Sequence, residues 1–235
     1  MSGKTEIAVV LLVVLMTVQG GAAEDPRVLR RVDHLVYTVP DLDGGIADLE
    51  SRLGVRATLG GQHPGRGTRN ALIAFGPDSY LEILAPDPAE RVPAGGRWFG
   101  VDAAAPARLA GWAVKGTDLK RVAARAAERG VPLGAVTGGS RARPDGVVLR
   151  WTLTDPTPPA VFGLAPFFID WGTSAHPAVT APRGPVLVSL RAEHPRPELV
   201  REPLAALGID LPVEPGPSPA LIATLRTVSG LVELR

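Results

Sequence analysis

Residues 32–55 read VDHLVYTVPDLDGGIADLESRLGV, and their pattern indicates the type of fold. A short strand-like run is followed by a turn at Asp41 and then by an amphipathic segment. Apolar residues share one helical face of that segment at Ile46, Leu49 and Leu53,. Asp41 is placed to cap the helix, and Gly54 can end it in the left-handed conformation. The stretch therefore predicts a strand followed by a capped helix.

The same pattern occurs twice more along the chain. Residues 109–131 read LAGWAVKGTDLKRVAARAAERGV, and residues 185–209 read PVLVSLRAEHPRPELVREPLAALGI. Asp118 stands at the cap position of the second helix. Further strand-like runs follow each helix, so the order is βαβββ each time. We predict modules at residues 31–90, 109–172 and 185–235, the third partial, together forming one domain. A generic α+β domain with chance matches is the alternative.

The composition narrows the classes of function. The chain has 235 residues, of which 45% are hydrophobic and 21% charged, as in ordinary globular proteins,. The net charge of +1 gives no reason to expect a nucleic-acid partner,. The absence of cysteine excludes disulfides, thiolate metal sites and a cysteine nucleophile,. The hydrolase motif GxSxG, the metalloprotease motif HExxH and a dinucleotide-binding loop are also missing from the sequence,.

An apolar leader precedes the first module. Residues 7–18 read IAVVLLVVLMTV, which is short for a membrane span,. The small residues Gly-Ala-Ala at 21–23 resemble a cleavage site,. We expect residues 1–23 to be a signal-peptide-like leader, 24–30 a linker, and the mature chain to be exported without a stable membrane span. The alternatives are a short membrane tether, or a start assigned too far upstream in a cytoplasmic protein.

Side chains alternate between the two faces of a strand, and this parity places two chemically active side chains together. In residues 32–39 the apolar side chains alternate to one face, so His34 points to the other,. In residues 80–84 the same alternation directs Tyr80 and Glu82 away from the helix. A carboxylate flanked by buried leucine and isoleucine is costly unless it is paired or coordinated. We therefore expect His34 and Glu82 to face one cleft. An ion pair between Glu82 and Arg66 or Arg69 is the alternative.

Three segments of the first module carry a resemblance to a known family. They are VDHLVYTVPDLD at 32–43, GGQHPGRGTRNALIAFG at 60–76 and SYLEILAPDP at 79–88. With the βαβββ repetition, they resemble the glyoxalase-like branch of the vicinal oxygen chelate superfamily. The resemblance is good over residues 31–90 and looser beyond. It implies an α+β fold of curved mixed sheets around a cleft, as in glyoxalases, bleomycin-resistance proteins and extradiol dioxygenases.

The resemblance also implies a divalent metal ion in the cleft. The first strand of a module and its last strand usually supply ligands, and the matching residues here are His34 and Glu82. Setting the acidic residues of the similar runs FFIDW and YLEIL opposite each other predicts Asp170 as the counterpart of Glu82. His63 is a further candidate ligand and Glu233 a remote one. Gly111 stands opposite His34 and supplies no ligand, so a degenerate site without metal stays open,.

The implied function is a metal-dependent enzyme that acts on a small substrate with a carbonyl or vicinal oxygens. Lyase, isomerase and dioxygenase chemistry all fit, with Glu82 as the catalytic carboxylate. The glycine-rich stretch 60–70, predicted as a polar loop, and its neighbours are expected to bind substrate through His63, Thr68, Arg69, Asn70 and Tyr80,. The alternative is a small-molecule-binding protein without catalysis. A small-molecule ligand is the expected partner. The third module could complete the sheet or make a homodimer contact.

The remaining histidines and aromatic residues are predicted to have ordinary structural roles. His176 and His194 each precede proline, which predicts turn or surface positions,. Trp112, Trp151 and Trp171 are expected to pack mainly in the core of the second module.

Overall fold

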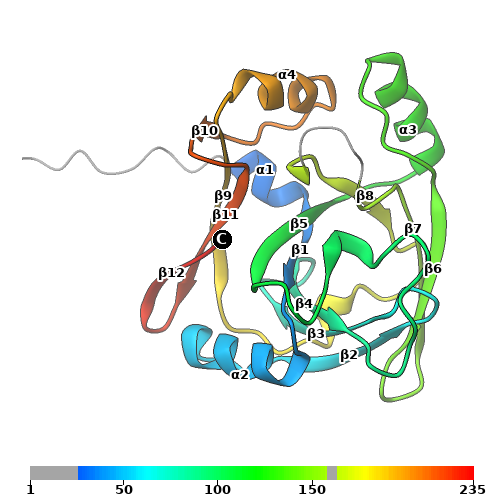
Figure 1. The fold of residues 1–235 in the computed structure, drawn as a ribbon, viewed down its shortest axis with the longest axis vertical. Coiled ribbons are helices and arrows are strands. Elements are labelled where there is room, and N and C mark those ends of the chain that lie inside the picture. Colours follow the sequence, from blue (N-terminus) through cyan, green and yellow to red (C-terminus); the bar gives the residue numbers. More distant parts are fainter. Residues whose placement is uncertain (1–25, 158–162) are drawn as a thin grey trace, which may run out of the picture.

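The computed structural model describes residues 26–157 and 163–235, and the predicted leader at 1–23 lies outside them. Within the described chain, the strands form one eight-stranded and one four-stranded sheet. The larger sheet curls around an axis, and helices lie outside it (Figure 1). The predicted α+β class with curved mixed sheets is confirmed. Most of the predicted linker is the short helix α1 (Pro26–Arg31).

Two successive βαβββ segments each contribute four strands to the larger sheet. The first comprises β1 (Val32–Thr38), α2 (Leu42–Leu53), β2 (Thr58–His63), β3 (Thr68–Ala74) and β4 (Tyr80–Pro86). The second comprises β5 (Arg108–Lys115), α3 (Leu119–Glu128), β6 (Thr137–Ala142), β7 (Val148–Leu153) and β8 (Phe167–Asp170). Two short 3-10 turns, η1 (Trp98–Gly100) and η3 (Pro177–Val179), lie in the connections after β4 and β8.

The strand order brings the ends of the larger sheet together. The order is β2-β3-β4-β1-β5-β8-β7-β6, with β1 and β5 antiparallel at its centre. The edge strands β2 and β6 touch, because a Cβ at Gly61 would lie 2.3 Å from the carbonyl oxygen of Ala142. The sheet is therefore almost closed, and its inner face encloses a space lined by side chains from both halves.

The helix boundaries follow the sequence signals only in part. The Asp41 carboxylate accepts a hydrogen bond from the Gly44 N–H at 2.7 Å, and Gly54 ends α2 with a φ of 74°. Asp118, also predicted to be a cap, makes no capping hydrogen bond. Its own φ is 50°, and its carboxylate pairs with Arg121 at 3.0 Å instead. The predicted cap at Asp118 is wrong because its left-handed backbone gives the carboxylate a different partner.

The glycine-rich stretch predicted as a loop is mainly a β-hairpin. Strand β2 continues to His63 and β3 begins at Thr68, so residues 64–67 alone make the turn. Because alternate residues of a strand face opposite sides, this change decides which polar side chains point inward. Strand β6, which the sequence analysis did not predict, reads TGGSRA and has two glycines and few β-branched residues,.

The third βαβββ segment forms its own sheet against the outside of the first two. It comprises β9 (Val186–His194), α4 (Glu198–Ala206), β10 (Val213–Pro215), β11 (Ala220–Thr227) and β12 (Gly230–Leu234), in the strand order β10-β9-β11-β12. The Leu109 N–H donates to the Arg235 carbonyl at 2.8 Å, which ties β5 to the chain end. One apolar cluster is shared between β1, α2 and this segment, including Leu35, Leu49, Leu190, Val200 and Leu225.

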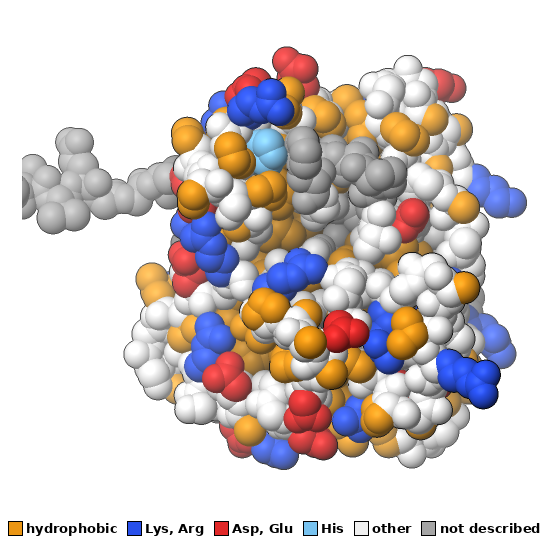
Figure 2. All heavy atoms as spheres, viewed as in Figure 1, with side chains coloured by type: hydrophobic (Ala, Val, Ile, Leu, Met, Phe, Trp, Pro, Cys, Tyr) orange, Lys and Arg blue, Asp and Glu red, His pale blue; other side chains and the backbone are white. Residues whose placement is uncertain are grey.

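Two surface properties bear on partners. No helix within residues 26–157 and 163–235 is long and apolar enough to cross a membrane. On the face in Figure 2, acidic and basic side chains are interspersed among apolar and neutral ones. This mixture agrees with the net charge of +1 and offers no single-sign field on that face,.

Candidate functional site

The inner face of the larger sheet encloses a pocket at the junction of its two halves. About 450 Å³ of space, including the open mouth, is unfilled by atoms. Aromatic and aliphatic side chains from η1, β7 and β8 form one side. The polar lining residues are His34, His63, Asn70, Tyr80, Glu82 and Arg141. An apolar enclosure with a few convergent polar groups is the usual form of a small-molecule site.

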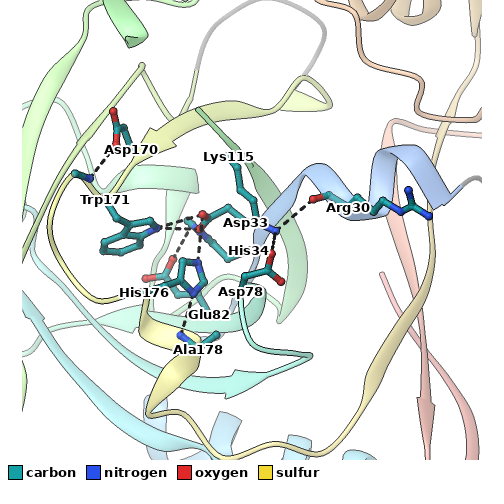
Figure 3. Close-up of polar contacts among 11 residues, drawn as sticks. Arg30, Asp33, His34, Asp78, Glu82, Lys115, Asp170, Trp171, His176 and Ala178 are labelled. Carbon is teal, nitrogen blue, oxygen red and sulfur yellow. Dashed lines mark hydrogen bonds and ion pairs between the residues drawn. The ribbon is translucent and has the colours of Figure 1, made fainter. Parts of the chain in front are cut away.

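His34 and Glu82 meet in this pocket, as strand parity predicted. The Nε2 atom of His34 lies 3.7 Å from Oε2 of Glu82, although the residues come from different strands. The Tyr80 ring stacks on His34 with centroids 4.7 Å apart. Figure 3 shows the imidazole and the carboxylate in one cluster at the centre of the sheet. Tyr80, also predicted as a site residue, therefore forms part of the same wall.

A buried carboxylate on the other side of His34 was not predicted. Asp33 is 1% exposed and accepts hydrogen bonds from three rings: His34 Nδ1 at 2.7 Å, Trp171 Nε1 at 3.2 Å and His176 Nε2 at 3.3 Å (Figure 3). The pairing of β1 with β5 is irregular between Val32 and His34, so Asp33 is the additional residue of a β-bulge,. The bulge allows two consecutive side chains to reach the same cluster.

This network sets the orientation of the His34 ring. Burial alone raises the pKa of Asp33, but hydrogen bonds from His176 and His34 outweigh it and hold the pKa well below its usual range. An ionised carboxylate only accepts hydrogen bonds, so Nδ1 of His34 carries a proton. In the neutral ring, Nε2 then has the free lone pair and is presented to Glu82 and the pocket,.

The other oxygen of the Glu82 carboxylate, Oε1, accepts a hydrogen bond from a neutral amide. Asn70 Nδ2 donates to Glu82 Oε1 at 2.6 Å and lies 3.3 Å from His63 Nε2. His63 Nδ1 lies 3.0 Å from Thr68 Oγ1. Burial lowers the pKa of His63 to about 4, since the nearby Glu82 carboxylate offsets the effect only in part. Both nitrogens of the neutral His63 ring are thus engaged, and Thr68 supports it from behind.

The buried state of His63 predicts a stability change with pH. Because its pKa is about 4 in the folded chain against 6.5 normally, the unfolded chain binds the proton first as pH falls,. Stability is therefore fully present above about pH 6.5 and declines towards pH 4. The loss at pH 5 is about 2 kcal/mol. Urea unfolding of wild type at pH 7.5 and 5.0 measures it.

A His63→Gln variant provides the control for this pH effect. It is expected to be less stable at both pH values, because it loses ring contacts, but to lack the drop between them. Asp33 does not interfere, since the stability from its lowered pKa is lost only below about pH 4,. An equal drop in the variant and wild type contradicts the assignment.

Three predicted site residues do not line the pocket. Thr68 contacts His63 from behind, while Arg69 and Asp170 point elsewhere. Arg69 lies between the inward-facing Thr68 and Asn70 on β3, so it points to the opposite face,. Asp170 ends β8, and its Oδ1 accepts a hydrogen bond from the Gly172 N–H at 2.8 Å, away from Glu82 (Figure 3).

The true counterpart of Glu82 in the second segment is Ile169. Tyr80 of β4 pairs in parallel with His34 of β1. In the same way, Phe167 of β8 pairs in parallel with Ala113 of β5. Two residues further along each strand stand Glu82 and Ile169, and both line the pocket. The predicted alignment of Asp170 was one residue out of register. By backbone register, Ala113 occupies the position of His34 in the second half of the sheet, and Ile169 occupies that of Glu82.

This donor set does not fit a zinc-type metal site. Structural and catalytic zinc ions take three or more protein ligands. Within the described residues, no group of three or more His, Asp or Glu side chains could hold one. His34 and Glu82 are two candidates, and His63 Nε2 lies 3.7 Å from Glu82 Oε1 but closer, at 3.3 Å, to the Asn70 amide nitrogen. The Arg141 side chain, a cation buried in the same pocket, adds repulsion. The chemistry below therefore rests on the protein's own groups.

Five residues of the cluster were not predicted from the sequence, for different reasons. Asp33 depends on the bulge, and His176 was assigned to a turn although it contacts Asp33. Arg141 stands on a strand that was not predicted. Trp151 and Trp171 line the pocket rather than packing only in the core. A sequence signal existed only for Asp33, as an acidic residue inside an apolar strand, which is costly unless satisfied.

Comparisons with known proteins agree with this architecture. The model of the glyoxalase-like domain family matches residues 32–208. A structure of a hypothetical protein from Staphylococcus aureus superposes with a TM-score of 0.59 at 14% identity, covering 82% of this chain and 89% of that one. No curated protein matches.

Methylmalonyl-CoA epimerases are more distant structural neighbours. A variant of the Streptomyces coelicolor enzyme, bound to 2-nitronate-propionyl-CoA, gives a TM-score of 0.41 at 22% identity over 59% of this chain and 95% of that one. The Mycobacterium tuberculosis enzyme gives 0.39 at 21% identity over 59% and 85%. The family match spans most of the chain, including both halves of the larger sheet. The chain belongs to the glyoxalase-like domain family of the vicinal oxygen chelate superfamily.

Proposed function

We propose that this protein is an enzyme that moves a proton on a small, oxygen-bearing molecule bound in the pocket. The observation that carries the proposal is the chain of contacts from Asp33 through His34 to Glu82. Asp33 holds Nδ1 of His34 at 2.7 Å, and Nε2 faces the Glu82 carboxylate at 3.7 Å. A carboxylate, an imidazole and an open pocket in this order are the components of general acid–base catalysis.

The roles follow from the hydrogen bonds. His34 Nε2 accepts a proton from a carbon next to a carbonyl or carboxyl group, and Asp33 stabilises the imidazolium that forms,. Glu82, oriented by Asn70 at 2.6 Å, is the second acid–base group. Burial, with the charges of Glu82 and Asp33, raises the pKa of Tyr80 well above its usual value. Its hydroxyl therefore stays protonated and can donate to an oxygen of the ligand.

The aromatic side of the pocket supports this chemistry by limiting water. Phe167 packs edge-on against His34 with ring centroids 5.3 Å apart, and Trp171 shields the Asp33 carboxylate. Charge interactions are stronger in such an environment than in water. The divalent ion implied by the family resemblance is not required for these roles.

Hydrogen exchange in D₂O tests the proposal. Small 2-oxo acids, 2-hydroxy acids and hydroxyketones are incubated with enzyme, and proton NMR follows the C–H signal beside the carbonyl or carboxyl group. Wild type is expected to exchange at least one class, also in the presence of a chelator. His34→Gln and Glu82→Gln are each expected to be slower by about 10²-fold or more. Unchanged exchange in both variants, or loss of wild-type exchange with chelator, contradicts the proposal.

Sequestration of a small molecule without turnover is the second candidate. It is favoured by the polar atoms of the pocket that lack a partner within the described residues, since these serve binding alone equally well. A ligand that perturbs the pocket signals in NMR but exchanges no C–H proton with wild type selects this candidate.

A further inference from the structure

Three polar atoms in the pocket have no hydrogen-bond partner among the residues that the structure describes. They are Nη1 of Arg141, Nε1 of Trp151 and Oδ1 of Asn70. All three side chains line the pocket, and they are 3%, 9% and 3% exposed, respectively. A buried donor or acceptor left unpaired is costly, and more so when it belongs to a charged group such as Arg141. Their concentration in one pocket indicates that a ligand completes them.

Glycines on the facing strands keep these atoms in place. A Cβ at Gly60 would lie 2.2 Å from Asn70 Oδ1 and 2.7 Å from Arg141 Nη1. A Cβ at Gly139 would lie 2.6 Å from Trp151 Nε1. The three polar groups occupy the space that these missing side chains leave.

Strand register puts the two donors on the same side of the sheet. Gly139 of β6 pairs directly with Trp151 of β7. Arg141 stands two residues after Gly139 and therefore shares its face. Burial lowers the pKa of Arg141, while Tyr80 and Glu82 oppose this shift, and a guanidinium stays charged at neutral pH,.

We propose that the ligand is a small carboxylate with a hydroxyl group on the adjoining carbon. The carboxylate accepts hydrogen bonds from Arg141 Nη1 and Trp151 Nε1, and the hydroxyl donates to Asn70 Oδ1. The assignment uses each atom by its chemistry, because the first two only donate and the third only accepts. It rests on the proposed function for the location of the ligand, and it adds the class of molecule and the residues that select it.

Three probes of nearly equal size separate the contribution of the carboxylate charge to binding from that of the hydroxyl group. Lactate has the carboxylate and the hydroxyl, lactamide lacks the charge, and propionate lacks the hydroxyl. Titrations followed by thermal unfolding at constant ionic strength are expected to show saturable stabilisation by lactate. Propionate is expected to bind more weakly, since it leaves Asn70 Oδ1 unpaired, and lactamide more weakly still. Lactate that binds no better than lactamide overturns the proposal.

Two arginine variants form a matched pair for this experiment. Arg141→Met is expected to weaken lactate binding about 10- to 100-fold and to remove the preference over lactamide. Arg143→Met removes the same charge two residues away, where Arg143 pairs with the exposed Asp145, and is expected to leave binding unchanged. Equal weakening by both variants shows a general charge effect and overturns the proposal.

Stability without ligand gives a readout that does not depend on the choice of probe. Arg141→Met is expected to unfold at a temperature no lower than wild type, because it removes a buried guanidinium whose Nη1 lacks a hydrogen-bond partner,. A marked loss of stability indicates a structural partner for Arg141 and overturns the proposal. Gly60→Ala, which crowds Asn70 and Arg141 without changing charge, is expected to weaken lactate binding as well.

The test of the carboxylate ligand can fail independently of the test of proton transfer. His34→Gln is expected to lose exchange while it retains the difference between lactate and lactamide. Exchange that persists in His34→Gln refutes the proposed function alone, whereas equal lactate affinity in Arg141→Met and wild type refutes the carboxylate assignment alone.

Discussion

Replacement of Asp33 by asparagine is expected to lower the C–H exchange rate by about 10²- to 10⁴-fold. The carboxylate accepts from His34, Trp171 and His176 at once, and its charge stabilises the imidazolium. Asparagine has one acceptor oxygen and two N–H donors, so it cannot satisfy three ring donors, and it supplies no charge. The lone pair of His34 Nε2 would no longer be directed reliably at the pocket. Exchange rates measured from pH 5 to 9 check the prediction.

The pH profile separates positioning from simple damage to the fold. Asp33→Asn is expected to change the pH at which exchange sets in, because the charge beside His34 is lost, whereas a structural defect lowers the rate at every pH alike. Asp170→Asn is the matched control, since this carboxylate lies away from Glu82 and bonds to Gly172. A wild-type rate in Asp33→Asn, or an equal loss in Asp170→Asn, contradicts the role assigned to Asp33.

Replacement of Trp112 by alanine is expected to destabilise the fold by about 3–5 kcal/mol. Trp112 on β5 is 0% exposed, and its Nε1 donates to the Leu164 carbonyl at 3.0 Å. The change leaves a cavity in the apolar cluster outside the sheet and an unpaired buried carbonyl,. Urea unfolding measures the difference in free energy. Leu231→Ala, at a position 69% exposed, is expected to change it by less than about 0.5 kcal/mol,. A loss below about 1 kcal/mol in Trp112→Ala contradicts the assigned packing.

The parts of the site that could be predicted are those governed by regular strand geometry. His34 and Glu82 each stand between apolar residues of a strand, so parity alone directs them to the inner face. Tyr80 follows from the same rule. The helix after Asp41 was predictable because capping and periodicity agree there. The repetition of βαβββ made the fold class accessible without any single strong motif.

The parts that could not be predicted depend on irregularities or on contacts distant in sequence. Parity fails at Asp33 because a bulge inserts one residue, which no sequence pattern announced. Asp170 was misassigned because the acidic residues of FFIDW and YLEIL were set opposite each other, whereas pairing the two runs residue by residue places Ile169 opposite Glu82. Arg141 became a site residue only when β2 and β6 came together. Gly60 and Gly61, predicted to lie in a polar loop, stand on β2 and provide room for the Asn70 and Arg141 side chains.

The central claim is that Asp33 holds His34 so that Nε2 is the base facing the pocket. Nitrogen-15 NMR of the imidazole rings tests it most directly, with His34 assigned by its absence from His34→Gln among the four histidines of the chain. At alkaline pH, where the ring is neutral, we predict a proton on Nδ1 and a free lone pair on Nε2, and we predict that Asp33→Asn disturbs this preference. A proton on Nε2 in wild type, with Nδ1 unprotonated, would contradict the account.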